Sequence, residues 1–464
     1  MLNGFIPGVW PSRLPNQGSY ATSGTNLGGT ARHAYKVMRS GAGVKLRFAN
    51  FYPNQGGSDL GVPANAGPIT IQAVAEYPID TFWPVFFNGQ PSITLQLGAF
   101  IDSDELGIEV NGGDNFFAKT DVQAPNPGAI PIGCFSGNID GEITSGGGVT
   151  FAIDGTQSGD NYPSHNAGAG TNQLLTTGQA WVTAAGQFSF GPTEILIRPT
   201  SNLLVPVIAH FGDSILDGSI DDGHDFGFAM RAAVRDGYSY KRLCRGGENG
   251  VLPSQGSWQR AAGHFVRASL AQGCTHVIWE YGTNDLAGGT TTWAAFQPAV
   301  LAAWKQVARH FPSAPLFATT ITPRVNGIGS NAAAQSTINA GYFSTSQSYN
   351  AWLRAPLSAG AGNSAAFDCI ANGILFGGCI DVASFVETNS ANAVPGGPSN
   401  PNLGGLWWCG AGNNSSGVTA FGADGVHPSK TGHLAIMSAL TASMFALPAG
   451  AVGNGSAPAA VGNG

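Results

Sequence analysis

The chain has 464 residues, 43% of them apolar, which is enough for two or three domains with buried cores. Only 10% of the residues are charged, whereas there are 68 glycines and 28 prolines, a composition that favours short strands and ordered loops over long charged helices. The net charge of −7 argues against nucleic acid as a partner.

No stretch approaches 18 consecutive apolar residues, so we expect no membrane insertion. The first 20 residues lack a basic region followed by an apolar run, so no secretory signal peptide is visible, and an extracellular or envelope location would need another export route. The cysteines show no CxxC spacing, which argues against a structural zinc site and leaves both disulfides and free thiols open. They are Cys134, Cys244, Cys274, Cys369, Cys379 and Cys409. We expect no metal and no cofactor.

The N-terminal part of the chain shows short alternating runs separated by glycine-rich turns. Such a pattern predicts the strands of an antiparallel sandwich, and no helical period is sustained here. The expected strands are 44–52, 69–77, 92–101, 148–154, 187–191 and 194–199. We assign residues 1–202 to an all-β accessory domain.

At residue 203 the pattern changes to apolar runs that alternate with helical segments. Residues 203–211, LLVPVIAHF, form a continuous apolar run typical of a strand buried on both faces. The elements expected after it are helices at 226–235, 258–272 and 292–311 and strands at 275–281 and 314–322. This alternation predicts a doubly wound α/β domain with a parallel sheet.

The rest of the chain completes this second domain, which we assign to residues 203–447. A Gly/Asn/Ser-rich insertion at 326–422 contains one expected helix, 336–353, and a short apolar strand or strands. Long insertions of this kind often carry function. A final helix is expected at 431–447, and the small residues of 448–464 predict a disordered tail.

A serine follows the first strand of the predicted parallel sheet, in Phe211-Gly212-Asp213-Ser214. Open α/β sheets form their sites at the carboxyl ends of the strands, so Ser214 is a candidate nucleophile near the start of the next helix. The alternative is an ordinary Asp/Ser cap.

Two further polar segments lie where the same edge of the sheet is expected. Asn284, in Gly-Thr-Asn-Asp after strand 275–281, offers an uncharged amide donor for an oxyanion. Asp424 precedes His427 by three residues, so the carboxylate could orient an imidazole that takes the proton of Ser214. The alternative for this pair is a helix cap beside a surface histidine. Asp213 and Asp285 are expected to hold these loops by hydrogen bonds.

The order of GDS, GTND and DxxHP resembles the SGNH hydrolase superfamily of GDSL-type esterases, over residues 206–447. The resemblance implies a flavodoxin-like doubly wound domain. It also implies that Ser214 is the nucleophile, His427 the general base, Asp424 its orienting carboxylate and Asn284 an oxyanion donor. The backbone amide of Ser214 would donate to the oxyanion too.

The superfamily completes its oxyanion hole with a glycine in a segment like N-x-G-x-S-G-[DN]. The matching segment here, Arg-Gly-Gly-Glu-Asn-Gly-Val at 245–251, points to Gly250. It departs from the usual pattern at Arg245, Asn249 and Val251. Gly246 and Gly247 therefore remain alternatives, as does a simple glycine-rich turn.

The strand-rich half is similar to the β domain that precedes the catalytic part in some secreted GDSL esterases acting on glycans. The similarity rests on VKLRFANFYPNQ, PITIQAVAEY and ITLQLGAFIDSDELGIEV, and it implies a jelly-roll domain that would contact carbohydrate. Trp352, Trp407 and Trp408 in the long insertion would either stack on sugar rings or pack within the loops.

These observations predict a serine carboxylic-ester hydrolase, with removal of O-acetyl groups from a polysaccharide as the expected reaction. The expected partners are an acetylated polysaccharide or a small ester. One alternative is a general short-chain esterase or lipase, although the polar insertion does not suit an apolar lid. The other is a carbohydrate-binding or structural module, such as a virion or envelope component, with a non-productive hydrolase domain.

Overall fold

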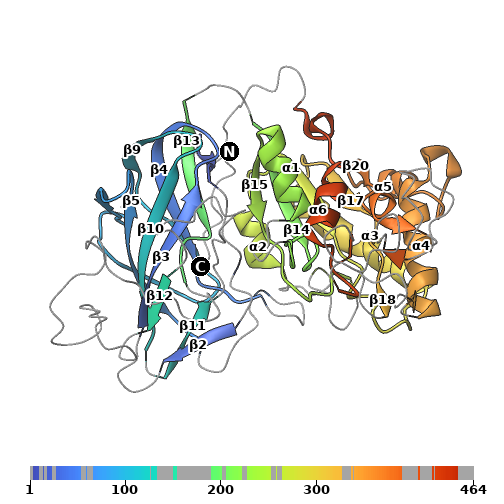
Figure 1. The fold of residues 1–464 in the computed structure, drawn as a ribbon, viewed down its shortest axis with the longest axis horizontal. Helices are drawn as coiled ribbons and strands as arrows, with labels where there is room; N and C mark the ends of the chain where they lie inside the picture. The colour runs from blue at the N-terminus through green and yellow to red at the C-terminus, as the bar shows by residue number, and fades with distance from the viewer. Residues whose placement is uncertain are drawn as a thin grey trace.

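The computed structural model has two regions of different architecture, antiparallel sheets up to Pro199 and an α/β region that follows (Figure 1). The structure describes residues 4–9, 14, 18–22, 28–53, 59, 66–125, 127–132, 150–153, 190–200, 205–221, 227–251, 258, 264–326, 336–337, 339–388, 406–407, 421–422 and 424–447. The tail predicted at 448–464 lies outside these residues.

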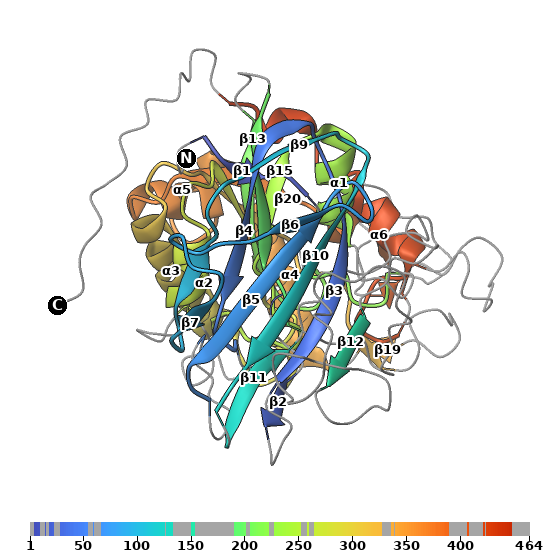
Figure 2. The same ribbon diagram turned by 90° about the vertical axis from the view of Figure 1, so that its left-hand side faces the viewer.

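The N-terminal region contains two larger antiparallel sheets and a two-stranded one. The first sheet has the order β1 (Ile6–Pro7), β13 (Glu194–Pro199), β4 (Gly41–Ala49) and β8 (Phe100–Asp102), and β9 (Leu106–Val110) also pairs with β4. The second has the order β12 (Thr150–Ile153), β3 (Gly28–Lys36), β10 (Asn115–Gln123), β5 (Ile69–Glu76) and β6 (Phe82–Pro84), with β7 (Ile93–Leu95) also on β5 (Figure 2). The smaller sheet pairs β2 (Gly18–Thr22) with β11 (Gly128–Ile132).

Alternating apolar residues build the core of this region. In β9 every second side chain is buried, and these residues join apolar side chains from β4 and β5 in one cluster. Since successive residues of a strand point to opposite faces, this alternation gives each sheet one apolar face to bury. The antiparallel all-β expectation for this half is therefore confirmed in the described residues.

Some of the predicted strands match the observed strands and others do not. Segments 69–77 and 194–199 correspond to β5 and β13, but 92–101 forms two strands, because a turn with Gly98 at φ 82° separates β7 from β8. β10 was not predicted. Of segment 187–191, residues 187–189 lie outside the described part and residues 190–191 are not in a strand.

The α/β region is built on a five-stranded sheet in which all neighbouring strands are parallel. Its order is β15 (Ser239–Arg242), β14 (Val207–Gly212), β16 (His276–Glu280), β17 (Leu316–Thr319) and β20 (Phe376–Ile380). Counted along the chain this is the order 2-1-3-4-5 of flavodoxin-like sheets. The predicted doubly wound parallel sheet is confirmed.

Helices cover both faces of this sheet (Figure 1). α1 (Phe228–Asp236) and α6 (Lys430–Met437) share a core with Ile208 of β14. Residues of α2 (Phe265–Leu270), α3 (Trp293–His310), α4 (Ala340–Arg354) and α5 (Ala365–Ala371) share another core with Ala209 and Phe211 of the same strand. Smaller elements are strands β18 (Val325–Asn326), β19 (Ser336–Thr337), β21 (Glu387–Thr388) and β22 (Leu406–Trp407), and 3₁₀ helices at Leu357–Ala359, Ala383–Phe385 and Ala442–Phe445.

Two elements of this region were not predicted, and two predicted helices have other bounds in the structure. Strand β15 and helix α5 were not predicted. Of the helix expected at 258–272, the described residues contain α2, six residues long, and residues 259–263 lie outside the described part. The final helix, expected to reach residue 447, ends at Met437 and is followed by the 3₁₀ helix Ala442–Phe445. Within the described residues, no helix is both long and apolar enough to cross a membrane.

Candidate active site

Ser214 lies in the tight turn that leaves the carboxyl end of β14. Gly212 makes this turn possible, because a Cβ there would lie 2.8 Å from the backbone oxygen of Glu280 in β16. The turn is closed by backbone hydrogen bonds from Asp217 to Asp213 and from Ser219 to Ser214. Ser214 is held in place and is 8% exposed.

His427 and Asp424 lie in the loop before α6, and their hydrogen bonds reach Ser214. Asp424 Oδ1 accepts the backbone amides of Val426 and His427, each at 2.6 Å, which fixes the bend between the two side chains. Asp424 Oδ2 lies 2.8 Å from His427 Nδ1, and His427 Nε2 lies 2.8 Å from Ser214 Oγ. The structure therefore brings together three residues that are up to 213 positions apart.

The charge state of Asp424 determines which way these hydrogen bonds run. Burial alone would raise the pKa of Asp424, but hydrogen bonds from the side chain and backbone of His427 and from Val426 lower it to about 2. An ionised carboxylate only accepts, so the proton of His427 belongs on Nδ1. Nε2 is then free to accept the proton of Ser214.

Two backbone amides near Ser214 have no hydrogen-bond acceptor in the described structure. Among the described residues, neither the amide of Ser214 nor that of Gly246 donates a hydrogen bond. The chain at Gly246 passes next to the serine, since a Cβ added there would lie 3.8 Å from Ser214 Cβ. Free amides that converge near a nucleophile can stabilise a tetrahedral oxyanion.

The expectation that Gly250 completes the oxyanion hole stays untested, but the amide of Gly250 is already engaged in a hydrogen bond. This amide donates to Asp285 Oδ2 at 3.0 Å, and Asp285 Oδ1 accepts the next amide, from Val251, at 2.8 Å. A backbone amide has a single proton, and this one is directed at a buried carboxylate. The glycine at this position is needed instead because a Cβ would overlap the side chain of Tyr281.

Asn284 lies between the serine turn and the glycine-rich segment 245–250. Its side-chain amide donates to Asp213 Oδ2 at 3.0 Å and to the backbone oxygen of Glu248 at 3.2 Å. Both amide protons are therefore in use, and Asn284 would have to release one of these bonds to donate to an oxyanion. Its role as an oxyanion donor remains a prediction.

A buried pair of carboxyl groups, which was not predicted, lies directly behind Ser214. Glu280 Oε2 accepts the backbone amides of Asp213 at 3.2 Å and Leu216 at 3.3 Å, and the side chains of Asp213 and Glu280 are hydrogen-bonded to each other. Burial raises the pKa of Asp213 to about 7, and burial together with the charge of Asp213 raises the pKa of Glu280. The pair therefore retains a proton near neutral pH. A glutamate at the end of an otherwise apolar strand was its signal in the sequence.

The tryptophans of the insertion do not form an exposed sugar-stacking surface where they are described. Trp352 is buried against α3 and donates to Asp368 Oδ2 at 2.8 Å. Trp407 is completely buried in the core with α1 and α6. Trp408 lies outside the described residues.

Four of the six cysteines are described, and all four are free thiols: Cys244, Cys274, Cys369 and Cys379. Cys134 and Cys409 lie outside the described residues. In the described ranges, no group of three or more histidine, cysteine or acidic side chains is arranged to hold a metal ion.

Comparison with known proteins gave matches among solved structures alone. No family model matches the chain, and no curated protein matches it. The matching solved structures include a family two carbohydrate esterase from Clostridium thermocellum in complex with cellohexaose, with 14% identity, a TM-score of 0.34 and coverage of 94% of this chain and 98% of that one.

Two other similar structures carry different names. A lipolytic protein of the G-D-S-L family from Veillonella parvula has 11% identity, a TM-score of 0.30 and coverage of 51% of this chain and 96% of that one. The salicylyl-acyltransferase SsfX3 of a tetracycline biosynthetic pathway has 12% identity, a TM-score of 0.29 and coverage of 89% and 79%. All three TM-scores are below 0.5, so the case for a function rests on the chain's own residues.

Proposed function

We propose that this protein is a serine carboxylic-ester hydrolase. The observation that carries the proposal is the continuous hydrogen-bonded series from Asp424 through His427 to Ser214, with both links at 2.8 Å. A nucleophile, a base and an orienting carboxylate in this order activate a serine hydroxyl for acyl transfer.

In the proposed mechanism, Ser214 Oγ attacks the ester carbonyl while His427 Nε2 takes its proton. Negative charge develops on the carbonyl oxygen, and the free amides of Ser214 and Gly246 are the donors that would stabilise it. Gly246 thus replaces Gly250 in the proposed oxyanion hole. His427 then returns the proton to the departing alcohol, and a water molecule hydrolyses the acyl-enzyme with His427 again acting as the base.

The proposed substrate is an O-acetylated polysaccharide. The low content of charged residues and the Gly/Asn/Ser-rich loops suit a polar, uncharged glycan better than a lipid. A general short-chain esterase or lipase is the alternative within the same chemistry. If the protein does not hydrolyse esters, the alternative is a carbohydrate-binding or structural module with a non-productive hydrolase domain.

We propose further that residues 1–202 form a jelly-roll-like accessory domain and residues 203–447 the catalytic domain. The two antiparallel sheets in the first part and the parallel sheet in the second support this division. Contact of the first domain with carbohydrate is part of the same proposal.

Acetate release tests the function. Wild type and Ser214→Ala would be compared at equal concentration on an aryl acetate and on a panel of acetylated polysaccharides, with exposed Ser443→Ala as the matched control. We expect release by wild type and the control and its loss in Ser214→Ala. Release from the aryl acetate alone would favour a general esterase, and an inactive wild type would favour the non-productive module. Undiminished release by Ser214→Ala would exclude Ser214 as the nucleophile.

A further inference from the structure

A buried chain of charged groups connects the N-terminal region to the glycine-rich segment beside Ser214. We call residues 245–250 the oxyanion loop. Asp59 lies in the sequence between β4 and β5 of the N-terminal sheets and accepts two hydrogen bonds from Arg267 of α2, 2.6 Å from Nε and 2.8 Å from the backbone amide. Both side chains are completely buried.

The other end of the same guanidinium holds the oxyanion loop. The two terminal nitrogens of Arg267 donate to the two carboxylate oxygens of Glu248, each at 2.7 Å. Tyr281 also donates to Glu248 Oε2 at 2.8 Å, and the backbone oxygen of Glu248 accepts Asn284 at 3.2 Å. Arg267 is thus fixed between a carboxylate of the N-terminal region and one that belongs to the loop.

A second contact joins the same two parts of the molecule. Arg245, the first residue of the oxyanion loop, donates from Nε to the backbone oxygen of Pro53 at 2.8 Å. Ala49 and Phe51, just before Pro53, belong to the apolar core that includes Phe211 of β14. The N-terminal region therefore contacts the α/β region at Pro53, Ala49 and Phe51 as well as at Asp59.

We propose that Asp59 is a positioning residue for the oxyanion loop, acting through Arg267 and Glu248 to hold the Gly246 amide and Asn284 beside Ser214. The inference rests on the proposed esterase function. It makes the all-β region a structural part of the catalytic centre rather than an appended module.

The physical reason is the cost of an unpaired buried charge. Replacing Asp59 by asparagine removes the negative charge that faces Arg267 and leaves one of its two donors, Nε or the backbone amide, without an acceptor in a site closed to water. The guanidinium and the loop attached to it must then shift, and sub-ångström errors in donor position weaken oxyanion stabilisation strongly. Substrate binding away from the oxyanion should change little.

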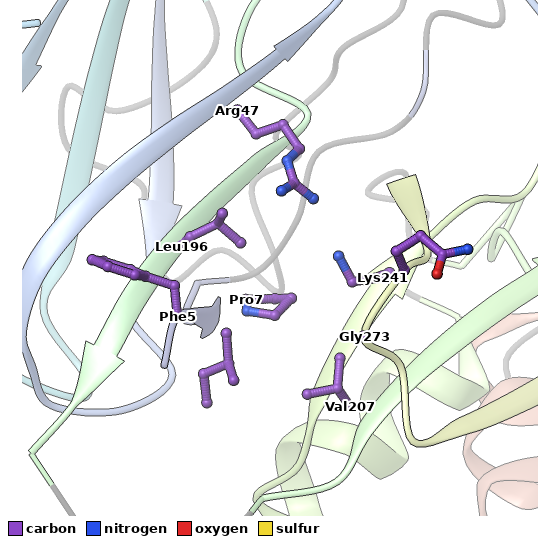
Figure 3. A pocket seen from close by; sticks show the side chains of 9 residues that line it. Phe5, Pro7, Arg47, Leu196, Val207, Lys241 and Gly273 are labelled. Atoms are coloured by element: carbon purple, nitrogen blue, oxygen red, sulfur yellow. The ribbon is translucent and has the colours of Figure 1, made fainter. Parts of the chain in front are cut away.

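Another buried ion pair across the same boundary provides a matched control. Lys241 of β15 lies 3.1 Å from both carboxylate oxygens of Glu194 of β13, and Arg47 of β4 also binds Glu194 at 2.9 Å. Figure 3 shows Arg47 and Lys241 facing a small cavity between the two regions, of about 20 Å³, which is large enough for a water molecule and too small for a sugar ring. Lys241 makes no bond to the oxyanion loop in the described structure.

The test compares Asp59→Asn with Lys241→Met in the full chain, using the aryl acetate and a thermal melt. We expect Asp59→Asn to lower kcat by about 10- to 100-fold with KM changed less than about threefold, because oxyanion stabilisation acts on the transition state. Lys241→Met should lower the Tm by a similar amount and leave kcat within about threefold. Equal effects of the two variants on kcat would overturn the inference.

A double-mutant cycle with Asn284→Ala separates positioning from general destabilisation. If Asp59 acts through the loop that Asn284 contacts, the losses in kcat of Asp59→Asn and Asn284→Ala should not multiply in the double variant. Fully multiplicative losses would contradict the proposal. Should Asp59→Asn fail to fold, Glu248→Gln tests the same chain from the loop end, with the same expected loss of kcat.

The two proposals fail in distinguishable ways. Activity that survives in Ser214→Ala removes the esterase mechanism itself. Activity that depends on Ser214 but is unchanged in folded Asp59→Asn removes the positioning role alone.

Discussion

His427 has a fixed orientation because Asp424 binds both its ring and its backbone. One carboxylate oxygen accepts two amides of the bend and the other faces Nδ1, so the position of the ring and its tautomer have the same cause. An asparagine could keep the backbone bonds through its side-chain oxygen while presenting NH₂ to the ring.

We therefore predict that Asp424→Asn folds normally and loses activity. The amide would favour the wrong tautomer of His427, and kcat should fall by about 10³- to 10⁴-fold. Kinetics on an aryl acetate together with a thermal melt check this, with Asp236→Asn as a control at another carboxylate outside the site. A folded variant within about tenfold of wild type would show that Asp424 does not set the tautomer.

The buried pair of Asp213 and Glu280 predicts a dependence of stability on pH. The folded-state pKa of Asp213, about 7, lies above the unfolded value of about 4, so the folded chain binds the proton more tightly. This contribution to stability is complete below about pH 4 and is lost as the pH rises to about 7. Because the pKa of Glu280 is also raised, the stability that the pair contributes continues to fall at higher pH.

Glu280→Gln should remove the part of this loss that comes from Glu280, because the neutral amide has nearly the same shape and can still accept the two backbone amides. We expect the Tm of the variant to match wild type near pH 5 and to exceed it at pH 8. Thermal melts of both proteins across this range provide the measurement. Parallel curves for the two proteins would mean that the pair does not retain a proton.

At the scale of elements, two glycines of the oxyanion loop that look alike in sequence have different surroundings in the structure. A Cβ at Gly250 would overlap Tyr281, whereas at Gly246 the nearest atom would be 3.8 Å away. Gly250→Ala should lower the free energy of unfolding by about 1–3 kcal/mol through overpacking. Gly246→Ala should leave it nearly unchanged. Urea denaturation of both variants measures these free energies. Equal losses in the two variants would contradict the prediction that Gly250, and not Gly246, is the crowded position.

The sequence predicted those elements in which the pattern of apolar residues follows the burial of the element. β14 and β16 are continuous apolar runs, and both were found with the polar residues of the site at their carboxyl ends. β15 was missed because its sequence, Ser-Tyr-Lys-Arg, contains two charges, and their partners Glu194 and Asp217 come from distant parts of the chain.

The three motifs likewise predicted which side chains come together, but not which backbone amides lack a hydrogen-bond acceptor. Ser214, Asp424 and His427 are in hydrogen-bond contact as expected from their order. The choice between Gly246 and Gly250 depended on the position of Asp285, which accepts the Gly250 amide. A single sequence carries no signal for that bond.

At the scale of the whole molecule, one of the apolar cores contains residues from both regions. Leu14, Ala49 and Phe51 belong to the same cluster as Phe211 and Trp258, and buried ion pairs join the regions at two places. No sequence pattern predicted these connections, because Asp59 sits in a glycine-rich segment and its partner Arg267 is 208 residues away.

This shared core predicts that the full chain unfolds in one cooperative transition. Neither region can lose its structure without exposing apolar surface of the other. Differential scanning calorimetry should give a single peak whose calorimetric and van't Hoff enthalpies agree. Two separated peaks would show that the regions are independent.

The most direct test of the central claim, an activated Ser214, is labelling with a fluorophosphonate followed by intact-mass and peptide analysis. A fluorophosphonate reacts with a serine that a neighbouring base has activated, whether or not the natural ester is known. We predict one phosphonyl group per chain on Ser214, slow labelling of Asp424→Asn and none of Ser214→Ala. A folded wild-type protein that is not labelled, or labelling of Ser214→Ala at the wild-type rate, would contradict the assignment of Ser214 as the nucleophile.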